Sequence, residues 1–373
     1  MKLQRFLFIF VLISSFAFSN IAQTSQPKPT PTPKTNNQVE DDGEIIKVNS
    51  RLVIVPVSVL NSSGQAVLGL KAQDFRVLEE NKIQEIAQVS DAEKVPLEIA
   101  LLFDISASTD SMFEFEQNTA ARFLQSVMRP EDRATIFTVG EKPVIVQARG
   151  TADNSAIAIK SIKPTKQFTA FYDTVRAAAD YLQKNAGQGR RKVILVISDG
   201  EDTNSEGIRL GFSSLYNSLG RDINKLTTKM LEDKRNEIKG REQAKVLKSL
   251  QNADAVFYAI NPAGSSYKLN KISIFGQSNL DKFANETGGA AFLPKFLPIN
   301  TKDQMQNSSN TKRNTETLQK IFQQLTNELQ AQYLVQYYSE GDFPANKYIK
   351  LNVGLQNQQN YRIRARQGYF VKN

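Results

Sequence analysis

Residues 97–108, LEIALLFDISAS, constrain the fold of this chain more than any other stretch. An apolar run of strand length ends in Asp104, and Ser106 and Ser108 follow, so one short loop carries three side-chain oxygen donors. A strand this hydrophobic is typical of a parallel sheet with both faces covered. Ligands of open α/β sheets bind at the carboxyl ends of such strands. We therefore expect a binding site at this loop.

Strand-length apolar runs alternate with helical patterns through the middle of the chain. This alternation predicts an α/β fold with a doubly wound, mostly parallel sheet and helices on both faces. The predicted strands are residues 98–104, 134–139, 144–147, 192–198, 255–260 and 290–293. The predicted helices are residues 112–128, 153–160, 170–184, 213–239, 241–252, 278–286 and 314–331.

The predicted helix 213–239 is longer than a crossover between two strands requires. Its apolar residues follow helical spacing, and we expect Gly240 to separate it from the next helix. Two interpretations remain open. The helix either packs on its own domain or binds a partner or a second copy of the chain.

Strand patterns also flank the α/β region on both sides. They cover residues 53–59, 75–78 and 83–89 before it, and residues 333–338, 348–353 and 361–370 after it. Pro56 within the first of these predicts an edge strand. The strands on either side are too few for a two-sheet domain, so we expect both groups to form one β-sandwich that contains or flanks the α/β domain.

The N-terminus has the pattern of an export signal, since Lys2 and Arg5 precede an apolar run at residues 6–18. We expect a secreted or periplasmic protein, with an uncleaved membrane anchor as the alternative. A Pro- and Thr-rich segment follows and is typical of an extended linker. The expected division is a signal peptide at 1–22, a linker at 23–44, a β part at 45–95, the α/β domain at 96–331 and C-terminal strands at 332–373.

The composition excludes several kinds of chemistry, because the chain has no His and no Cys. A Ser-His-Asp triad, a thiol nucleophile and the usual zinc sites all require one of these residues. Any metal must therefore be held by oxygen, which favours Mg²⁺, Ca²⁺ or Mn²⁺. We expect a protein that is not an enzyme.

The formal charge is +9, and two segments dominate it. Residues 207–251 hold ten Lys and Arg against five Asp and Glu, and residues 361–373 hold four basic residues and no acidic one. Such segments are either solvated basic faces or attract an acidic partner or an anionic envelope surface. Because of the export signal, no nucleic acid is expected as a partner.

Two further motifs belong with the first loop. Thr169 lies in QFTAFYD at residues 167–173, where a loop enters a predicted helix, and Asp199 ends the strand in ISDG at residues 197–200. Asp104 and Asp199 should approach each other, and two charges about 4 Å apart repel by about 4 kcal/mol at a dielectric constant near 20. A divalent cation removes this repulsion, and Mg²⁺ accepts hydroxyl, carboxylate and water oxygens.

The motifs DISAS, FTAFYD and ISDG resemble the metal-ion-dependent adhesion site of von Willebrand factor type A domains, across about residues 96–331. The flanks, such as VPVSVLNSSGQAVLGLKAQDFRVLEENKIQEI and YRIRARQGYF, are similar to a group of exported bacterial proteins with such domains. The resemblance implies a Rossmann-like fold. It also implies Mg²⁺, with Mn²⁺ or Ca²⁺ as alternatives, and an acidic residue of a protein ligand that completes the coordination sphere. The ligands implied by the motif match are Asp104, Ser106, Ser108, Thr169 and Asp199.

The resemblance has two departures, since no Gly precedes Thr169 and the insert at 213–239 could cover or extend the site. Simpler roles are also open. Asp104 could cap the following helix, Thr169 could be the N-cap of helix 170–184, and Asp199 could belong to an ordinary turn. We expect Glu201 and Asp202 to be solvated and Asp173 to cap or pair locally.

These observations favour a non-enzymatic, Mg²⁺-dependent protein-binding or adhesion module of the cell envelope or extracellular space. One alternative is a metal-dependent hydrolase that uses Asp199 or Glu201 as a base on metal-bound water. Another is a scaffold whose site stays empty. The identity of the partner and the oligomeric state are left open.

Overall fold

The computed structural model describes residues 50–90, 94–106, 110–165, 167–187, 189–220, 227–262, 271–299, 301–357 and 360–372. The predicted signal peptide at 1–22 and linker at 23–44 lie outside the described residues. None of the helices in these ranges combines the length and hydrophobicity needed to cross a bilayer.

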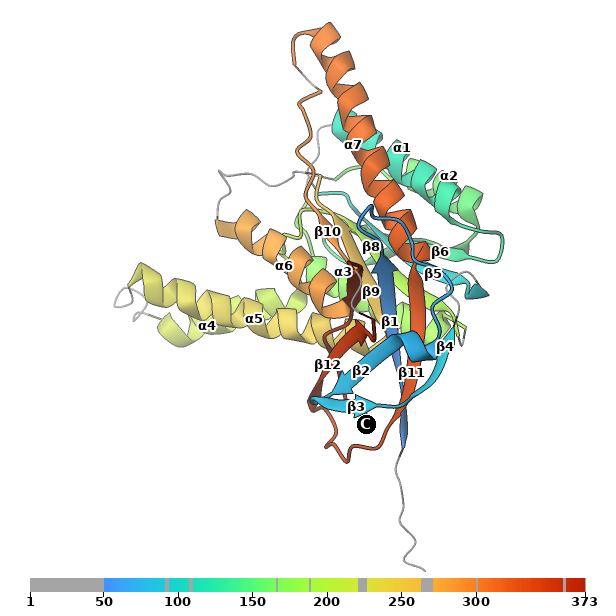
Figure 1. The fold of residues 1–373 in the computed structure, drawn as a ribbon. Helices are drawn as coiled ribbons and strands as arrows, with labels where there is room; N and C mark the ends of the chain where they lie inside the picture. Colours follow the sequence, from blue (N-terminus) through green and yellow to red (C-terminus); the bar gives the residue numbers. More distant parts are fainter. Residues whose placement is uncertain are drawn as a thin grey trace, which may run out of the picture. The chain divides into compact units, whose positions relative to one another are not determined.

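A six-stranded sheet in the order β10-β9-β8-β5-β6-β7 forms the centre of the described structure (Figure 1). All neighbouring pairs are parallel except β6 and β7, which are antiparallel. The strands are β5 (Leu97–Asp104), β6 (Arg133–Val139), β7 (Val144–Gly150), β8 (Arg191–Ile197), β9 (Ala255–Ile260) and β10 (Ala291–Phe292). The chain order reverses between β5 and β8, and open α/β sheets bind ligands at such a switch point. The predicted α/β class is confirmed.

Helices cover both faces of this sheet. Successive residues of β5 point to opposite faces, so they contribute to two separate cores. Ile99, Leu101 and Phe103 pack in one core with α1 (Asp110–Val127), α2 (Ala152–Ser161) and α7 (Gln304–Gln330). Ala100 and Leu102 pack in a second core on the other face. The helices of that face are α3 (Phe171–Asn185), α4 (Glu206–Leu219), α5 (Thr228–Asn252) and α6 (Lys271–Thr287).

Two four-stranded sheets flank the α/β layers and share a third core. Their orders are β13-β1-β11-β4 and β14-β12-β2-β3, so each sheet combines strands from before and after the α/β region. The strands are β1 (Arg51–Leu60), β2 (Phe75–Glu79), β3 (Lys82–Gln84), β4 (Ile86–Ser90), β11 (Gln332–Ser339), β12 (Tyr348–Leu355), β13 (Arg362–Ala365) and β14 (Gly368–Phe370), with a short 3-10 helix η1 (Ala72–Asp74). The domain boundaries at residues 95 and 332 stay a prediction.

Three predictions about these strands are wrong in detail. β1 lies inside its sheet rather than at the edge, but its pairing with β13 begins only at Val57, so Pro56 has a paired neighbour only in β11. The predicted strands 83–89 and 361–370 are each two strands. In both cases the chain crosses from one sheet to the other, because β3 and β14 pair in one sheet and β4 and β13 in the other.

The long helix predicted at 213–239 is also wrong. α4 ends at Gly220, whose φ of +48° favours glycine, and α5 runs without a break through Gly240. A glycine inside a helix costs about 1 kcal/mol relative to alanine. The burial of Ile238, Val246 and Leu250 on both sides of Gly240 outweighs this cost.

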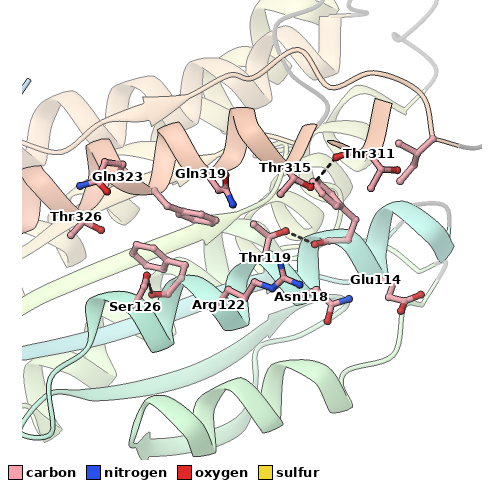
Figure 2. Close-up of a pocket in the computed structure, with 14 residues that line it drawn as sticks. Glu114, Asn118, Thr119, Arg122, Ser126, Thr311, Thr315, Gln319, Gln323 and Thr326 are labelled. Atoms are coloured by element: carbon pink, nitrogen blue, oxygen red, sulfur yellow. Dashed lines mark hydrogen bonds between the residues drawn. The ribbon is translucent and has the colours of Figure 1, made fainter. Parts of the chain in front are cut away.

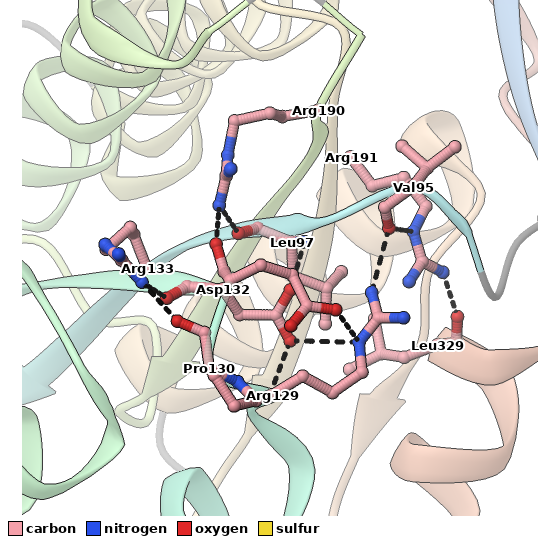
Figure 3. Close-up of polar contacts among 10 residues, drawn as sticks. Val95, Leu97, Arg129, Pro130, Asp132, Arg133, Arg190, Arg191 and Leu329 are labelled. Carbon is pink, nitrogen blue, oxygen red and sulfur yellow. Dashed lines mark hydrogen bonds and ion pairs between the residues drawn. The ribbon is translucent and has the colours of Figure 1, made fainter.

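The end of the sheet remote from Asp104 is held by buried polar contacts (Figure 3). Asp132 accepts hydrogen bonds from the N–H groups of Leu97 and Arg129, at 2.6 and 2.8 Å. Arg191 donates to the carbonyl oxygens of Val95 and Leu329, and so attaches the end of α7 to the start of β8. Ala331 alone separates α7 from β11, so α7 is joined directly to the β-sandwich.

Candidate metal site

Asp104 is the last residue of β5, and its carboxylate is held by two neighbours. Oδ1 accepts a hydrogen bond of 2.9 Å from the N–H of Ser106, and Oδ2 accepts one of 2.6 Å from Ser198 Oγ. Asp104 therefore does not cap α1, which begins six residues later at Asp110. Ser108, the third predicted donor of this loop, lies outside the described residues.

Thr169 lies in the loop between α2 and α3 and is buried. Its N–H donates to Thr203 Oγ1 at 2.9 Å, and its carbonyl oxygen accepts from the N–H groups of Thr203 and Asn204, also at 2.9 Å. The N-cap of α3 is Ala170, so the interpretation of Thr169 as a plain N-cap is wrong. These backbone contacts instead join its loop to the one that follows β8.

Asp199 is the second residue after β8, and its Oδ1 accepts a 2.9 Å hydrogen bond from the N–H of Glu201. The next residue, Gly200, has φ +77°, and a Cβ there would lie 2.4 Å from the carbonyl oxygen of Gly276 in α6. The carbonyl of Gly200 accepts from Asn279 Nδ2 at 2.9 Å. A residue without a side chain thus lets this loop pack directly against α6.

The three loops that carry the motifs are hydrogen-bonded to one another. Ile105 in the first loop accepts from the N–H of Thr165 in the second, at 2.7 Å. The second loop is joined to the third through Thr169, and the third to the first through Ser198 and Asp104. The fold therefore brings the loops of Asp104, Ser106, Thr169 and Asp199 together at the switch point between β5 and β8.

The carboxyl groups of this region lack cationic partners. Burial raises the pKa of Asp104 above its usual range, and burial raises the pKa of Asp199 to about 6, with a smaller contribution from the charge of Asp104. Within the described ranges, no Lys or Arg forms an ion pair with either group. With a pKa of about 6, Asp199 is mostly ionised at neutral pH, and no cation of the described ranges offsets its charge.

Glu116 in α1 is a third buried carboxyl group, which the sequence analysis missed. It is 5% exposed, and its Oε1 has no hydrogen-bond partner among the residues that the structure describes. Burial, followed by the charge of Asp104, raises its pKa to about 8. Its spacing from Phe113 and Ala120, which are both buried, places it on the inner face of α1 and could have revealed it.

Two neighbouring aspartates have structural roles. Asp202 was expected to be solvated, which is wrong, because it accepts hydrogen bonds from the N–H of Tyr172 at 2.7 Å and from Ser205. Burial raises the pKa of Asp202 to about 6. Asp173 caps α4 by accepting from the N–H of Glu206 at 2.8 Å, and it forms the expected local pair with Arg176 at 3.9 Å. Glu201 is partly exposed and accepts from Ser273 Oγ.

The available donors suit a hard cation. No cluster of three or more acidic side chains suited to a metal occurs in the described ranges, so an ion here would need hydroxyl and water oxygens besides Asp104 and Asp199. Mg²⁺ accepts such a mixed set of oxygens and keeps several waters. The unpartnered Oε1 of Glu116 also fits a site that lacks a positive charge.

A groove of about 720 Å³ lies between α1 and α7 (Figure 2). The labelled side chains along it are mostly hydroxyls and amides, such as Asn118, Thr315 and Gln319. The rings of Phe123 and Phe322 stack 4.6 Å apart beneath them. The groove contains none of the predicted metal ligands and is separate from the three loops.

Comparison with known proteins gives one family match. The model of the von Willebrand factor type A domain matches residues 99–201, which include Asp104, Ser106, Thr169 and Asp199. No curated protein matches the chain.

Three solved structures are among those to which the chain is similar. The conserved hypothetical protein BatB from Bacteroides thetaiotaomicron is 13% identical, with a TM-score of 0.35, over 60% of this chain and 99% of BatB. An aerotolerance-related membrane protein from Bacteroides fragilis is 15% identical, with a TM-score of 0.34, over 60% of this chain and 99% of that one. Proximal thread matrix protein 1 from the mussel byssus, with a zinc-occupied MIDAS motif, is 13% identical, with a TM-score of 0.39, over 66% and 48% of the two chains.

Proposed function

Since the chain contains a von Willebrand factor type A domain, we propose that it is a non-enzymatic binding module in which a divalent cation joins it to a carboxylate of a protein partner. Asp104, Ser106, Ser108, Thr169 and Asp199 would hold the ion, with Mg²⁺ as the expected metal. When bound, the cation would neutralise the carboxylates and accept one ligand oxygen from the partner.

One observation carries this proposal. Three loops with oxygen-rich motifs are hydrogen-bonded to one another around carboxyl groups that no Lys or Arg neutralises in the described part of the chain. Burying a carboxylate without a positive partner is unfavourable, so such a group either retains a proton or binds a cation, and a bound cation would stabilise the ionised form.

The protein's own residues prepare this site before any ion binds. Ser198 and the N–H of Ser106 orient the carboxylate of Asp104, and the N–H of Glu201 orients that of Asp199. The close packing of Gly200 against Gly276 positions the third loop directly on α6. A site whose donors are already in place loses less conformational entropy on binding.

The predicted export signal favours the cell envelope or the extracellular space for the proposed activity. A pull-down from an envelope extract tests the proposal, with the full chain as bait in Mg²⁺ or in EDTA. Asp104→Ala is the test variant, and Asp180→Ala, at an exposed position on α3, is the matched control. We expect a partner that is retained by wild type and Asp180→Ala in Mg²⁺ only, and that Asp104→Ala does not retain. Equal recovery in all samples would contradict the proposal.

A further inference from the structure

Arg235 and Lys239 lie one turn apart on α5, and each rests against an aromatic ring. The guanidinium carbon of Arg235 is 5.6 Å from the ring centre of Tyr216, and Arg235 Nε donates to the Tyr216 hydroxyl at 2.9 Å. Lys239 Nζ is 4.7 Å from the ring centre of Phe275 in α6. The two rings hold both cations in place on one side of the α4–α5 hairpin.

Neither cation forms an ion pair with a carboxylate of the described residues. Two other cations of the same helix have polar partners, since Lys245 pairs with Glu242 and Lys248 donates to Asn346, both at 2.6 Å. Like charges four residues apart on a helix repel each other and destabilise it. An anion from outside the chain would remove this repulsion.

Lys239 lies against the turn of α6 that contacts the loop of Asp199, and Arg235 lies one turn before Lys239 on α5. Lys239 lies over the ring of Phe275, and the next residue is Gly276. Gly276 packs against the loop after β8, since a Cβ there would be 2.8 Å from the carbonyl oxygen of Asp199 and 3.0 Å from Glu201 N. Ser273, on the same turn of α6, donates to Glu201. Consistent with this placement, the charges of Asp202 and Glu201 act on Lys239, although burial and Arg235 lower its pKa overall.

We propose that Arg235 and Lys239 form a second anion-binding position next to the metal site, so that the partner is an acidic protein segment with two carboxylates. The first carboxylate reaches the metal, and the second lies between Arg235 and Lys239. This inference rests on the proposed function. It also assigns a role to the hairpin, whose residues 207–251 hold twice as many basic as acidic side chains.

Synthetic peptides test this inference on the full chain in Mg²⁺. One fluorescent Gly/Ser peptide carries a single Asp, and a series carries a second Asp at increasing spacing from the first. An exposed charge pair contributes up to about 1 kcal/mol, so the best two-Asp peptide should bind about fivefold more tightly than the one-Asp peptide. Fluorescence anisotropy measures both affinities.

Three double variants distinguish a specific position from general attraction. Arg235→Gln/Lys239→Gln should lose the fivefold gain without changing the affinity for the one-Asp peptide. Lys229→Gln/Lys234→Gln removes the same charge from exposed positions of α5 and should keep the gain. Arg235→Lys/Lys239→Arg retains both charges and should also keep it.

No gain at any spacing, or an equal loss in both glutamine double variants, would overturn the inference while leaving the proposed function intact. One-Asp binding that persists in EDTA would instead overturn the proposed function and this inference with it.

Discussion

The hydroxyl of Ser198, at the end of β8, donates a hydrogen bond of 2.6 Å to Oδ2 of Asp104, at the end of β5. This contact joins the carboxyl ends of two neighbouring parallel strands at the point where the strand order reverses. Together with the N–H of Ser106, it fixes the orientation of a carboxylate that has no cationic partner among the described residues. The proposed metal site depends on this orientation.

Replacing Ser198 with alanine tests the importance of this contact. A hydrogen bond to a charged group contributes about 1.5–3 kcal/mol, so Ser198→Ala should weaken Mg²⁺ binding by about tenfold or more. Isothermal titration calorimetry measures the affinity. Ser126→Ala, which removes an exposed hydroxyl in α1, should bind as wild type does, and unchanged affinity in Ser198→Ala would contradict the assigned role.

Gly200→Ala should disturb the loop that carries Asp199. Its Cβ would meet the carbonyl oxygen of Gly276 at 2.4 Å and Leu280 at 2.8 Å, so the loop must move away from α6. We expect a loss of about 1–3 kcal/mol in unfolding free energy, measured in urea, and weaker metal binding. Gly64→Ala has the same φ of +77° with open space around it and separates backbone strain from the clash. Equal effects of both variants would show that the contact with Gly276 is unimportant.

Glu116→Gln should stabilise the metal-free protein at high pH. Because the pKa of Glu116 is raised from 4.5 to about 8, the folded state retains a proton that the unfolded state releases between these values. Its contribution to stability is thus complete below pH 4.5 and is lost as the pH rises through about 8.

Urea unfolding in EDTA should therefore show little difference between Glu116→Gln and wild type at pH 4.5. At pH 8 the variant should be more stable by on the order of a few kcal/mol. The exposed Glu114 on the same helix provides the control, since Glu114→Gln should follow the wild-type curve at both pH values. A Glu116→Gln curve parallel to that of wild type would refute the buried, uncompensated state of this carboxyl group.

Metal affinity should fall as the pH decreases through about 6. The pKa of Asp199 is about 6, and a cation competes with the proton for the carboxylate. Well below this pH, each further unit should weaken binding by up to about tenfold for each carboxyl group that takes up a proton. Mg²⁺ titrations at pH 7 and pH 5 measure this dependence, and equal affinities would exclude Asp199 as a ligand.

The predicted fold is confirmed most clearly for strands that are buried on both faces, because such strands are continuous apolar runs in the sequence. β5, β8 and β9 are continuous apolar runs, and the structure places each within one residue of its predicted bounds. The ends of the strands in the β-sandwich could not be predicted from apolar runs. The strand pattern at 83–89 continues while the chain crosses between sheets at Glu85, and this change of partner depends on contacts with β2 and β11 that are distant in sequence.

For the candidate site, the motifs identified residues but not their neighbours. Asp104, Ser106, Thr169 and Asp199 lie on loops that the structure brings together, and their role as metal ligands stays a prediction. Sequence spacing could not show that Ser198 contacts Asp104, because the partner lies 94 residues away. Sequence spacing also could not show that Asp202 accepts a hydrogen bond from the first turn of α3. Asp202 and the partly exposed Glu201 are adjacent after the same strand, and nothing in the sequence separates their roles.

Mn²⁺ binding followed by electron paramagnetic resonance tests the central claim most directly, because the free ion gives a signal that is lost on binding and the number of sites can be counted. We expect one Mn²⁺ site per chain, displaced by Mg²⁺, and its loss in Asp104→Ala but not in Asp180→Ala. Absence of binding to the wild-type chain, or equal binding by Asp104→Ala, would contradict this claim.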